Sequence, residues 1–165
     1  MIHIQKGIAD AESLLEDLGY STLPVRPFDV AREIDSDDFK LEMEQQSFQS
    51  ARILGRAEGN NKGALVYINS NIPDEKRLNF TAAHELGHVC MHIMPMVKMS
   101  FECGNNEFSD SFSDPVEQEA NGFASGLLLP KGLISNLTDG EVNWSNIDIV
   151  SRNCQASLEA AYRKM

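Results

Sequence analysis

The eight residues from Thr81 to His88, TAAHELGH, restrict what this chain can fold into more than any other stretch. They contain H-E-x-x-H, a helical pattern in which two histidines bind zinc and the glutamate acts as a general base. Positions four apart on an α-helix differ by about 40° in direction and about 6 Å in height. His84 and His88 can therefore reach one metal ion, and Glu85 stands beside them as the candidate catalytic base.

Two histidines on one helix face also occur as ordinary core residues. The glutamate between them makes that alternative costly, because burying a carboxylate without a cation is unfavourable. Nitrogen and oxygen ligands accept several divalent ions, among them manganese. The prediction is a single zinc ion, because zinc is the metal that this helical pattern usually holds.

A third protein ligand has to come from outside the motif, since catalytic zinc usually takes three protein ligands and keeps one position open. His92 is unsuitable, because on a continuous helix it lies about 12 Å along the axis from His84. Glu117 and Glu119 lie on a later predicted helix and point about 160° apart, so only one can face the ion. Glu119 is closer to the apolar side, where a carboxylate needs a cation. We therefore predict Glu119 as the metal ligand, with Glu117 as the alternative.

Composition limits the classes of protein that remain. At 165 residues, with 42% apolar and 24% charged residues, the chain suits one globular domain. A net charge of -11 disfavours nucleic-acid binding, which rests on clustered lysine and arginine. Three cysteines without a C-x-x-C pair suit a reducing cytoplasm, and no apolar run approaches the roughly 20 residues that cross a bilayer. We expect a cytoplasmic protein without direct contacts to nucleic acid or membrane.

The order of the predicted elements indicates an α+β fold of the zincin type. Phe39, Leu41 and Met43 alternate with charged residues, and residues 64–69, ALVYIN, are the most strand-like segment. We expect a small three-stranded, mostly antiparallel sheet packed against several helices, within one domain over residues 1–165. Its expected parts are N-terminal helices within 1–36, a β-meander over 39–69, the motif helix over 74–93, the third-ligand helix over 115–129 and C-terminal helices over 133–165.

The segment from Met96 to Asp114 is polar and has no clear period, although it carries three phenylalanines. A loop of this length in a compact domain is usually functional or mobile. It could cover a cleft, but packing of its phenylalanines against the core is the favoured interpretation. Cys103 lies in this loop and could bind the metal reversibly, whereas an incidental thiol is the preferred alternative because nothing in the sequence predicts a lowered pKa there.

Five short motifs lie between residues 80 and 130 of the chain: Phe80-Thr81, His84-Glu85-Leu86-Gly87-His88, Glu119-Ala120-Asn121, Phe123-Ala124 and Leu127-Leu128-Leu129-Pro130. In this order and spacing they resemble the ImmA/IrrE family of zinc metallopeptidases, in a short stand-alone form. This resemblance implies a gluzincin-like fold and cytosolic cleavage of a helix-turn-helix repressor, which derepresses mobile-element or stress-response genes. Leu129 departs from the methionine that the family often has at its position.

Other roles stay open from the sequence. Thr81 and Asn121 are candidates for orienting the ligands, a role that polar neighbours often have. A donor to the developing oxyanion is usual in peptide hydrolysis, and Tyr67, Tyr162 and His92 are candidates. The main alternative function is a non-catalytic regulatory or antitoxin-type module that keeps zinc for structure, although Glu85 would then have no task. Direct DNA binding by the C-terminal helices is a third possibility, which the negative charge disfavours.

Overall fold

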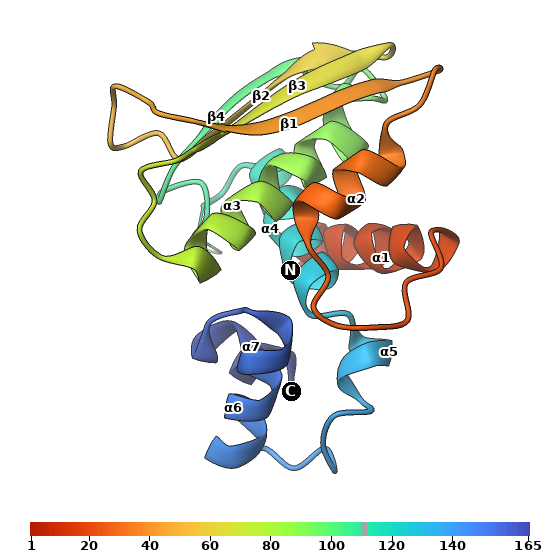
Figure 1. Ribbon diagram of the computed structural model, residues 1–165, viewed down its shortest axis with the longest axis vertical. Coiled ribbons are helices and arrows are strands. Elements are labelled where there is room, and N and C mark those ends of the chain that lie inside the picture. Colours follow the sequence, from red (N-terminus) through yellow and green to blue (C-terminus); the bar gives the residue numbers. More distant parts are fainter. Residues whose placement is uncertain (110–111) are drawn as a thin grey trace.

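A computed structural model describes residues 1–109 and 112–165, so the part of the predicted 96–114 loop at Asp110 and Ser111 lies outside the described residues. The fold is α+β, with a mixed sheet on one side and helices beneath it (Figure 1). In chain order the elements are α1 (Ile2–Asp17), α2 (Pro27–Ile34), β1 (Lys40–Gln46), β2 (Gly55–Asn60), β3 (Gly63–Asn69), α3 (Glu75–His88), the π-helix η1 (Val89–Ile93), β4 (Ser100–Cys103), α4 (Pro115–Leu128), α5 (Lys131–Ile134), α6 (Trp144–Cys154) and α7 (Leu158–Lys164).

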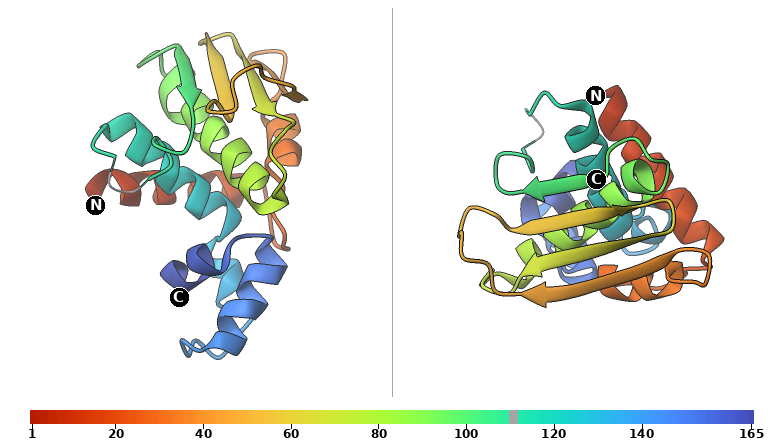
Figure 2. Two further views of the ribbon diagram at one scale, coloured as in Figure 1. Left: turned by 90° about the vertical axis from the view of Figure 1, so that its left-hand side faces the viewer. Right: turned by 90° about the horizontal axis from the view of Figure 1, so that it is seen from above.

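The sheet has four strands in the order β1-β3-β2-β4 rather than the three of the predicted meander (Figure 2, right). β1 runs parallel to β3, whereas the β2–β3 and β2–β4 pairs are antiparallel. A two-residue turn joins β2 to β3, and the most apolar strand, β3, lies between two neighbours with Val66 and Ile68 fully buried. The prediction of a three-stranded meander is therefore wrong, because β1 pairs with β3 and not with β2.

The fourth strand comes from the segment that was predicted to be irregular. β4 is only four residues long, and its residues alternate between exposed and buried, with Phe101 and Cys103 inward. A run this short gives too few positions for a period of two to stand out in the sequence. The phenylalanine and the cysteine nonetheless point to the same face of the sheet, toward the helices.

The motif helix, predicted over 74–93, is an α-helix up to His88 and a π-helix from Val89 to Ile93. Asp74 caps its start by accepting a hydrogen bond from the Lys76 backbone N–H. After His88 the chain continues as the π-helix η1, in which the Met94 N–H donates to the Val89 carbonyl at 2.9 Å. Such π segments are frequent at functional sites. The α-helix therefore stops one turn before the predicted end.

Helix α4 is buried on more than one side, because it packs against both α1 and α3. Small residues permit this close approach: a Cβ on Gly126 would lie 2.7 Å from the Ile8 carbonyl oxygen, and one on Gly87 of α3 would lie 2.9 Å from Phe123. A helix with neighbours on two sides has no single core face. Acidic residues on different sides of α4 can therefore both be buried, as Glu117 and Glu119 are.

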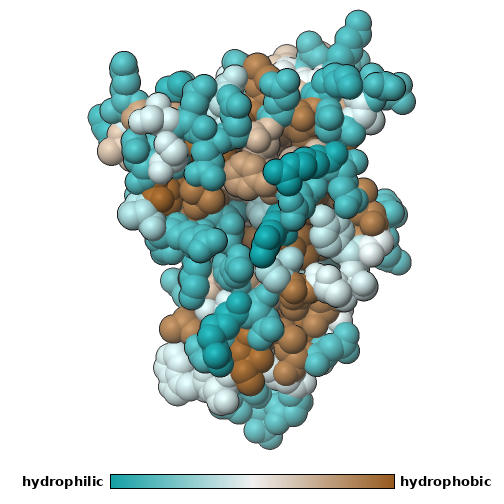
Figure 3. Space-filling model, in the orientation of Figure 1, coloured by the Kyte–Doolittle hydropathy of each residue, from teal (hydrophilic) through white to brown (hydrophobic). Residues whose placement is uncertain are grey.

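The C-terminal helices α5, α6 and α7 lie at the opposite end of the molecule from the sheet (Figure 1). Figure 3 shows apolar side chains gathered on the visible surface of this end as well as nearer the sheet. Buried residues such as Val150 and Ala161 belong to the same apolar core as the sheet and α3. The organisation of residues 1–165 as one domain stays a prediction. None of the helices in the described ranges is long and apolar enough to cross a membrane.

Candidate metal centre

Two histidines, a glutamate and a cysteine meet beneath the sheet. Nε2 of His84 and Nε2 of His88 lie 3.1 and 3.0 Å from Oε1 of Glu117. Sγ of Cys103 lies 3.5 Å from both His88 Nε2 and Glu117 Oε1. All four ligand atoms fall within 4.8 Å of one another, and all four residues are buried. This arrangement is a candidate metal centre.

The spacing of these atoms fits the coordination sphere of zinc. A tetrahedral zinc ion binds imidazole nitrogen and carboxylate oxygen at about 2.0–2.2 Å and thiolate sulfur at about 2.3 Å, which places neighbouring ligand atoms about 3.3–3.6 Å apart. The observed contacts of 3.0–3.5 Å are close to that range. Two imidazoles, a carboxylate and a thiol are also donors that zinc accepts. The residues present therefore fit a zinc ion.

Helices α3 and α4 position the two histidines and the glutamate of the cluster. His84 and His88 lie one turn apart on α3, as the motif predicts. Glu117 stands in the first turn of α4, whose start is fixed by Pro115 and by the Asp114 side chain, which accepts from a backbone N–H. Two predicted helix signals thus place a carboxylate opposite the two imidazoles.

The structure places Glu119 away from this cluster. Its Oε2 accepts a hydrogen bond from Lys6 Nζ at 2.7 Å, and its Oε1 lies 3.1 Å from Nε2 of His92. Glu117, the alternative of the two glutamates, lies beside His84 and His88, whereas the favoured Glu119 does not. The physical reason is that Glu119 is buried on the side of α4 that faces α1, where Lys6 already supplies a cation. Which of the two glutamates binds a metal stays a prediction.

Outer contacts hold both imidazoles in one orientation. Nδ1 of His84 lies 2.9 Å from Oδ1 of Asn121, whose side-chain amide donates to the Glu107 carbonyl at 2.8 Å. Nδ1 of His88 shares a 3.0 Å hydrogen bond with Nδ1 of His92. Asn121 and His92 therefore contact the histidines from behind, and such partners fix which ring nitrogen is free for a metal. His92, a predicted candidate for the oxyanion donor, thus lies between His88 and Glu119.

Thr81 and the two tyrosines lie elsewhere. The Thr81 hydroxyl donates to the Arg77 carbonyl of its own helix, at 2.8 Å, and not to an imidazole. Tyr67 alternates with the buried Val66 and Ile68 and so points to the other face of the sheet. The side of α7 that carries Tyr162 is exposed, since 58% of that residue is accessible to solvent. None of these three lies against the histidine cluster.

Aromatic side chains of the 96–109 segment cover the imidazoles. The Phe101 ring stacks on His88 with centroids 3.6 Å apart, and the Phe108 ring meets His84 edge-on at 4.6 Å. This confirms the prediction that phenylalanines attach the segment to the core. The two imidazoles beneath these rings, His84 and His88, are 0% exposed.

Glu85 is the most unusual polar residue of the centre. Both of its carboxylate oxygens are buried, and neither has a hydrogen-bond partner among the described residues. Burial raises the pKa of Glu85 to about 8, while Cys103 acts to lower it and Glu117 to raise it further. Its side chain fits against Gly55 of β2, where a Cβ would lie 2.7 Å from the Glu85 Cγ. The carboxylate thus lies next to the cluster, and two cluster residues, Cys103 and Glu117, shift its pKa.

The remaining protonation states suit a metal site. Burial lowers the pKa of His88 to about 3, although its contact with Glu117 opposes the shift, so the imidazole is neutral as a metal ligand must be. Burial acts to raise the pKa of Glu117, but hydrogen bonds with His84 and His88 outweigh it and hold that pKa well below its usual range. Burial and the nearby carboxylates raise the pKa of the Cys103 thiol.

Comparison with known proteins places the chain in a family. Residues 36–165 match the peptidase family described as the IrrE N-terminal-like domain. The chain belongs to this family. It is also 32% identical over 99 residues to "Uncharacterized immunity region protein 2" of Bacillus phage phi105. That alignment covers 60% of this chain and 59% of the phage protein. The family match and the similarity to a phage protein both agree with the resemblance that the sequence motifs show.

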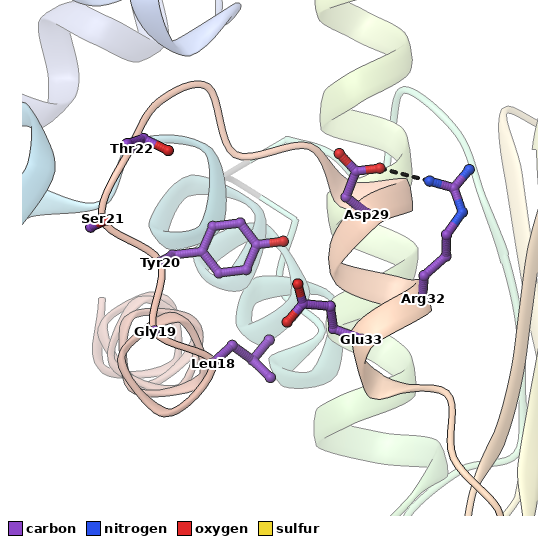
Figure 4. A pocket seen from close by; sticks show the side chains of 8 residues that line it. All are labelled: Leu18, Gly19, Tyr20, Ser21, Thr22, Asp29, Arg32 and Glu33. Carbon is purple, nitrogen blue, oxygen red and sulfur yellow. Dashed lines mark hydrogen bonds and ion pairs between the residues drawn. The ribbon is translucent and has the colours of Figure 1, made fainter.

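A hollow on the surface lies away from the metal centre. It measures about 480 Å³ and is bordered by the turn after α1 and by α2, where Asp29 and Arg32 form a 2.7 Å ion pair (Figure 4). Tyr20 points toward α2 across this hollow. Its lining includes none of the four cluster residues. The candidate centre is therefore a closed, buried site and not part of this hollow.

Proposed function

We propose that this chain is a zinc-dependent metalloendopeptidase with His84, His88 and Glu117 as metal ligands. The observation that carries the proposal is the convergence of the two Nε2 atoms on one Glu117 oxygen, at 3.1 and 3.0 Å, beside an unpartnered Glu85. Two histidines and a glutamate are the ligand set of thermolysin-like enzymes. Membership in a peptidase family supports the same assignment.

When bound, a zinc ion would polarise a peptide carbonyl and acidify water at this site. The task of Glu85 is to accept a proton and pass it to the leaving amine, which requires a pKa near neutrality in a water-poor site. Burial raises the pKa of Glu85 from its usual acidic range toward neutrality, to about 8. Asn121 and His92 keep the imidazoles in place, while Phe101 and Phe108 keep bulk water off the rings.

We propose a helix-turn-helix transcriptional repressor as the protein substrate, whose cleavage derepresses mobile-element or stress-response genes. The family resemblance implies such a substrate, and the likeness to a phage immunity-region protein supports a link to repression. A net charge of -11 suits a partner that is basic because it binds DNA. The free cysteines suit the reducing cytoplasm in which such a repressor works.

The test is to co-express the chain with the repressor encoded beside it and to follow the repressor by mass spectrometry. The matched control is Glu85→Gln, which keeps side-chain size and leaves the metal ligands intact. Cleavage by the native chain and its loss in Glu85→Gln support the peptidase. Loss of general-base help typically costs about 10²–10⁴-fold in rate, so residual cleavage should be undetectable within one cell generation.

A non-catalytic regulatory module, of the antitoxin type, is the second candidate. A metal with four protein ligands is the pattern of a structural zinc site, and the Cys103 thiol offers that fourth ligand. In this case the repressor would be released by binding alone. Derepression that survives Glu85→Gln, with the repressor uncut, would support this module over the enzyme.

A further inference from the structure

Cys103 brings a fourth ligand atom to a set of three, at the position that catalytic zinc sites leave for water or substrate. Its Sγ lies 3.5 Å from both His88 Nε2 and Glu117 Oε1. The sulfur is directed there by strand geometry, because Cys103 and Phe101 share the inward face of β4, and Phe101 stacks on His88. One short strand therefore closes the centre with two adjacent inward side chains.

The isolation of Glu85 is a second and independent sign of closure. A general base needs a proton donor within hydrogen-bonding reach, yet both Glu85 oxygens are buried and unpartnered in the described part of the chain. The metal-binding residues are equally inaccessible, since His84 and His88 are 0% exposed, Cys103 is 1% exposed and Glu117 is 4% exposed. A peptide cannot reach either the ligands or the base while β4 is in place.

We propose that the Cys103 thiolate is a fourth metal ligand that holds the site in a latent, closed form. This inference rests on the proposed peptidase function and deepens it by naming how the same site is regulated. Activation is a ligand exchange without oxidation or reduction. The sulfur–metal bond breaks, the departing thiolate takes up one proton from solvent, and the vacated position becomes available to the reaction.

The short strand β4 lies at the edge of the sheet, so it can move away from β2 as one segment. Among the described residues it is an edge strand that pairs with β2 alone, in a register that pairs Cys103 with Gly55. The Leu54 N–H donates to the Cys103 carbonyl at 2.8 Å, and the Gly59 N–H donates to the Met99 carbonyl at 3.0 Å at the other end of this short strand. Movement of β4 away from β2 removes the thiol from the cluster and Phe101 from His88 in one step. The side of the cluster that Cys103 and Phe101 cover would then open.

Cobalt substitution tests the sulfur ligand without any assay of cleavage. The full-length chain is loaded with one equivalent of Co²⁺, and its near-ultraviolet thiolate-to-cobalt charge-transfer band is recorded. We expect the band in the native chain and in Cys154→Ser, which alters another buried free cysteine away from the cluster. The band should vanish in Cys103→Ser and Cys103→Ala, with thermal unfolding confirming that each variant folds.

Zinc competition gives a second readout. Removal of Cys103 should weaken zinc binding by at least about tenfold, the lower end of the loss seen when an outer-shell partner is removed. At saturating zinc, Cys103→Ser should cut the co-expressed repressor faster than the native chain does. The gain should disappear in the Cys103→Ser, Glu85→Gln double variant.

The outcomes separate the two proposals. Bound cobalt without a thiolate band in the native chain overturns the fourth-ligand inference and leaves the peptidase intact. Equal cleavage by zinc-loaded native chain and Cys103→Ser overturns latency. Failure of the native chain to bind one equivalent of either metal overturns the proposed function, and the inference with it.

Discussion

Two glutamates of helix α4 pair with histidines, and these pairings, the inner and the outer pair, differ in what balances the negative charge. In the inner pair, Glu117 contacts His84 and His88 at 3.1 and 3.0 Å. In the outer pair, Glu119 contacts His92 at 3.1 Å and also a lysine, Lys6, at 2.7 Å. The outer carboxylate has its own cation. The inner one contacts His88, whose imidazole is neutral because burial lowers its pKa, and a buried carboxylate there calls for a metal ion.

The two pairs are also connected. Nδ1 of His88 meets Nδ1 of His92 at 3.0 Å, so a chain of contacts runs from the inner cluster through His92 and Glu119 to Lys6 at the surface. When Nε2 of His88 binds a metal, Nδ1 must carry the proton and donate it to His92, which in turn donates to Glu119. The outer pair therefore supports the inner one without taking part in coordination.

The largest expected effect comes from exchanging the two carboxylates for amides. Glu117→Gln should lose stoichiometric zinc, because it removes a direct ligand together with the charge that balances the ion. Glu119→Gln is the matched control on the same helix, and it should still bind one zinc at saturation. Elemental analysis of the two purified variants measures the difference. Full zinc in Glu117→Gln, or none in Glu119→Gln, would reverse the assignment of inner and outer pairs.

Most of the fold and part of the candidate site could be predicted from the sequence. The motif spacing predicted one helix that carries His84, Glu85 and His88, as the structure has it, and the signals at Asp114 and Pro115 located the start of α4 to within one residue. Local patterns of this kind depend on neighbours in the chain. They therefore remain visible without any tertiary information.

The third ligand depended on information that one segment does not contain. An argument from a single apolar face favours Glu119, but α4 packs against α1 as well as α3, so both glutamates are buried. The deciding contact, Lys6 to Glu119, joins residues 113 positions apart. β4 was hidden for a related reason, since four residues paired to a distant strand carry almost no local period.

A smaller effect is expected from a change that touches only the inner region. Gly55→Ala would place a Cβ 2.7 Å from Cγ and 2.8 Å from Oε1 of Glu85. The base must shift while the metal ligands stay, so repressor cleavage should fall about 100-fold, the cost of a displacement of about 1 Å at a reacting group. Zinc content should be unchanged. Gly132→Ala, where a Cβ meets nothing within 4 Å, is the control glycine, and equal cleavage by both variants would contradict this placement of Glu85.

The link between the two pairs can be cut at His92. His92→Phe keeps a flat ring but removes both ring nitrogens, so His88 loses the partner that fixes its tautomer. Zinc affinity should fall by roughly 10–100-fold, the usual cost of losing such a partner. Competition with a chromogenic chelator measures the change. Unaltered affinity would show that His88 is oriented by Phe101 alone, and the two regions would then be independent.

Lys6→Met is expected to have the smallest effect, and it tests whether the outer pair really carries its own cation. Lys6 is 61% exposed, so its ion pair with Glu119 contributes at most about 1 kcal/mol to stability. Without the Lys6 ammonium group, Glu119 attracts the proton of its hydrogen bond with His92 more strongly. Zinc affinity should therefore change, but by less than in His92→Phe. Lys62→Met, an exposed change far from Glu119, is the control for lost surface charge. A loss of zinc as large as that of Glu117→Gln would mean that the charge of Lys6 is felt at the inner cluster, which would end the separation of the two pairs.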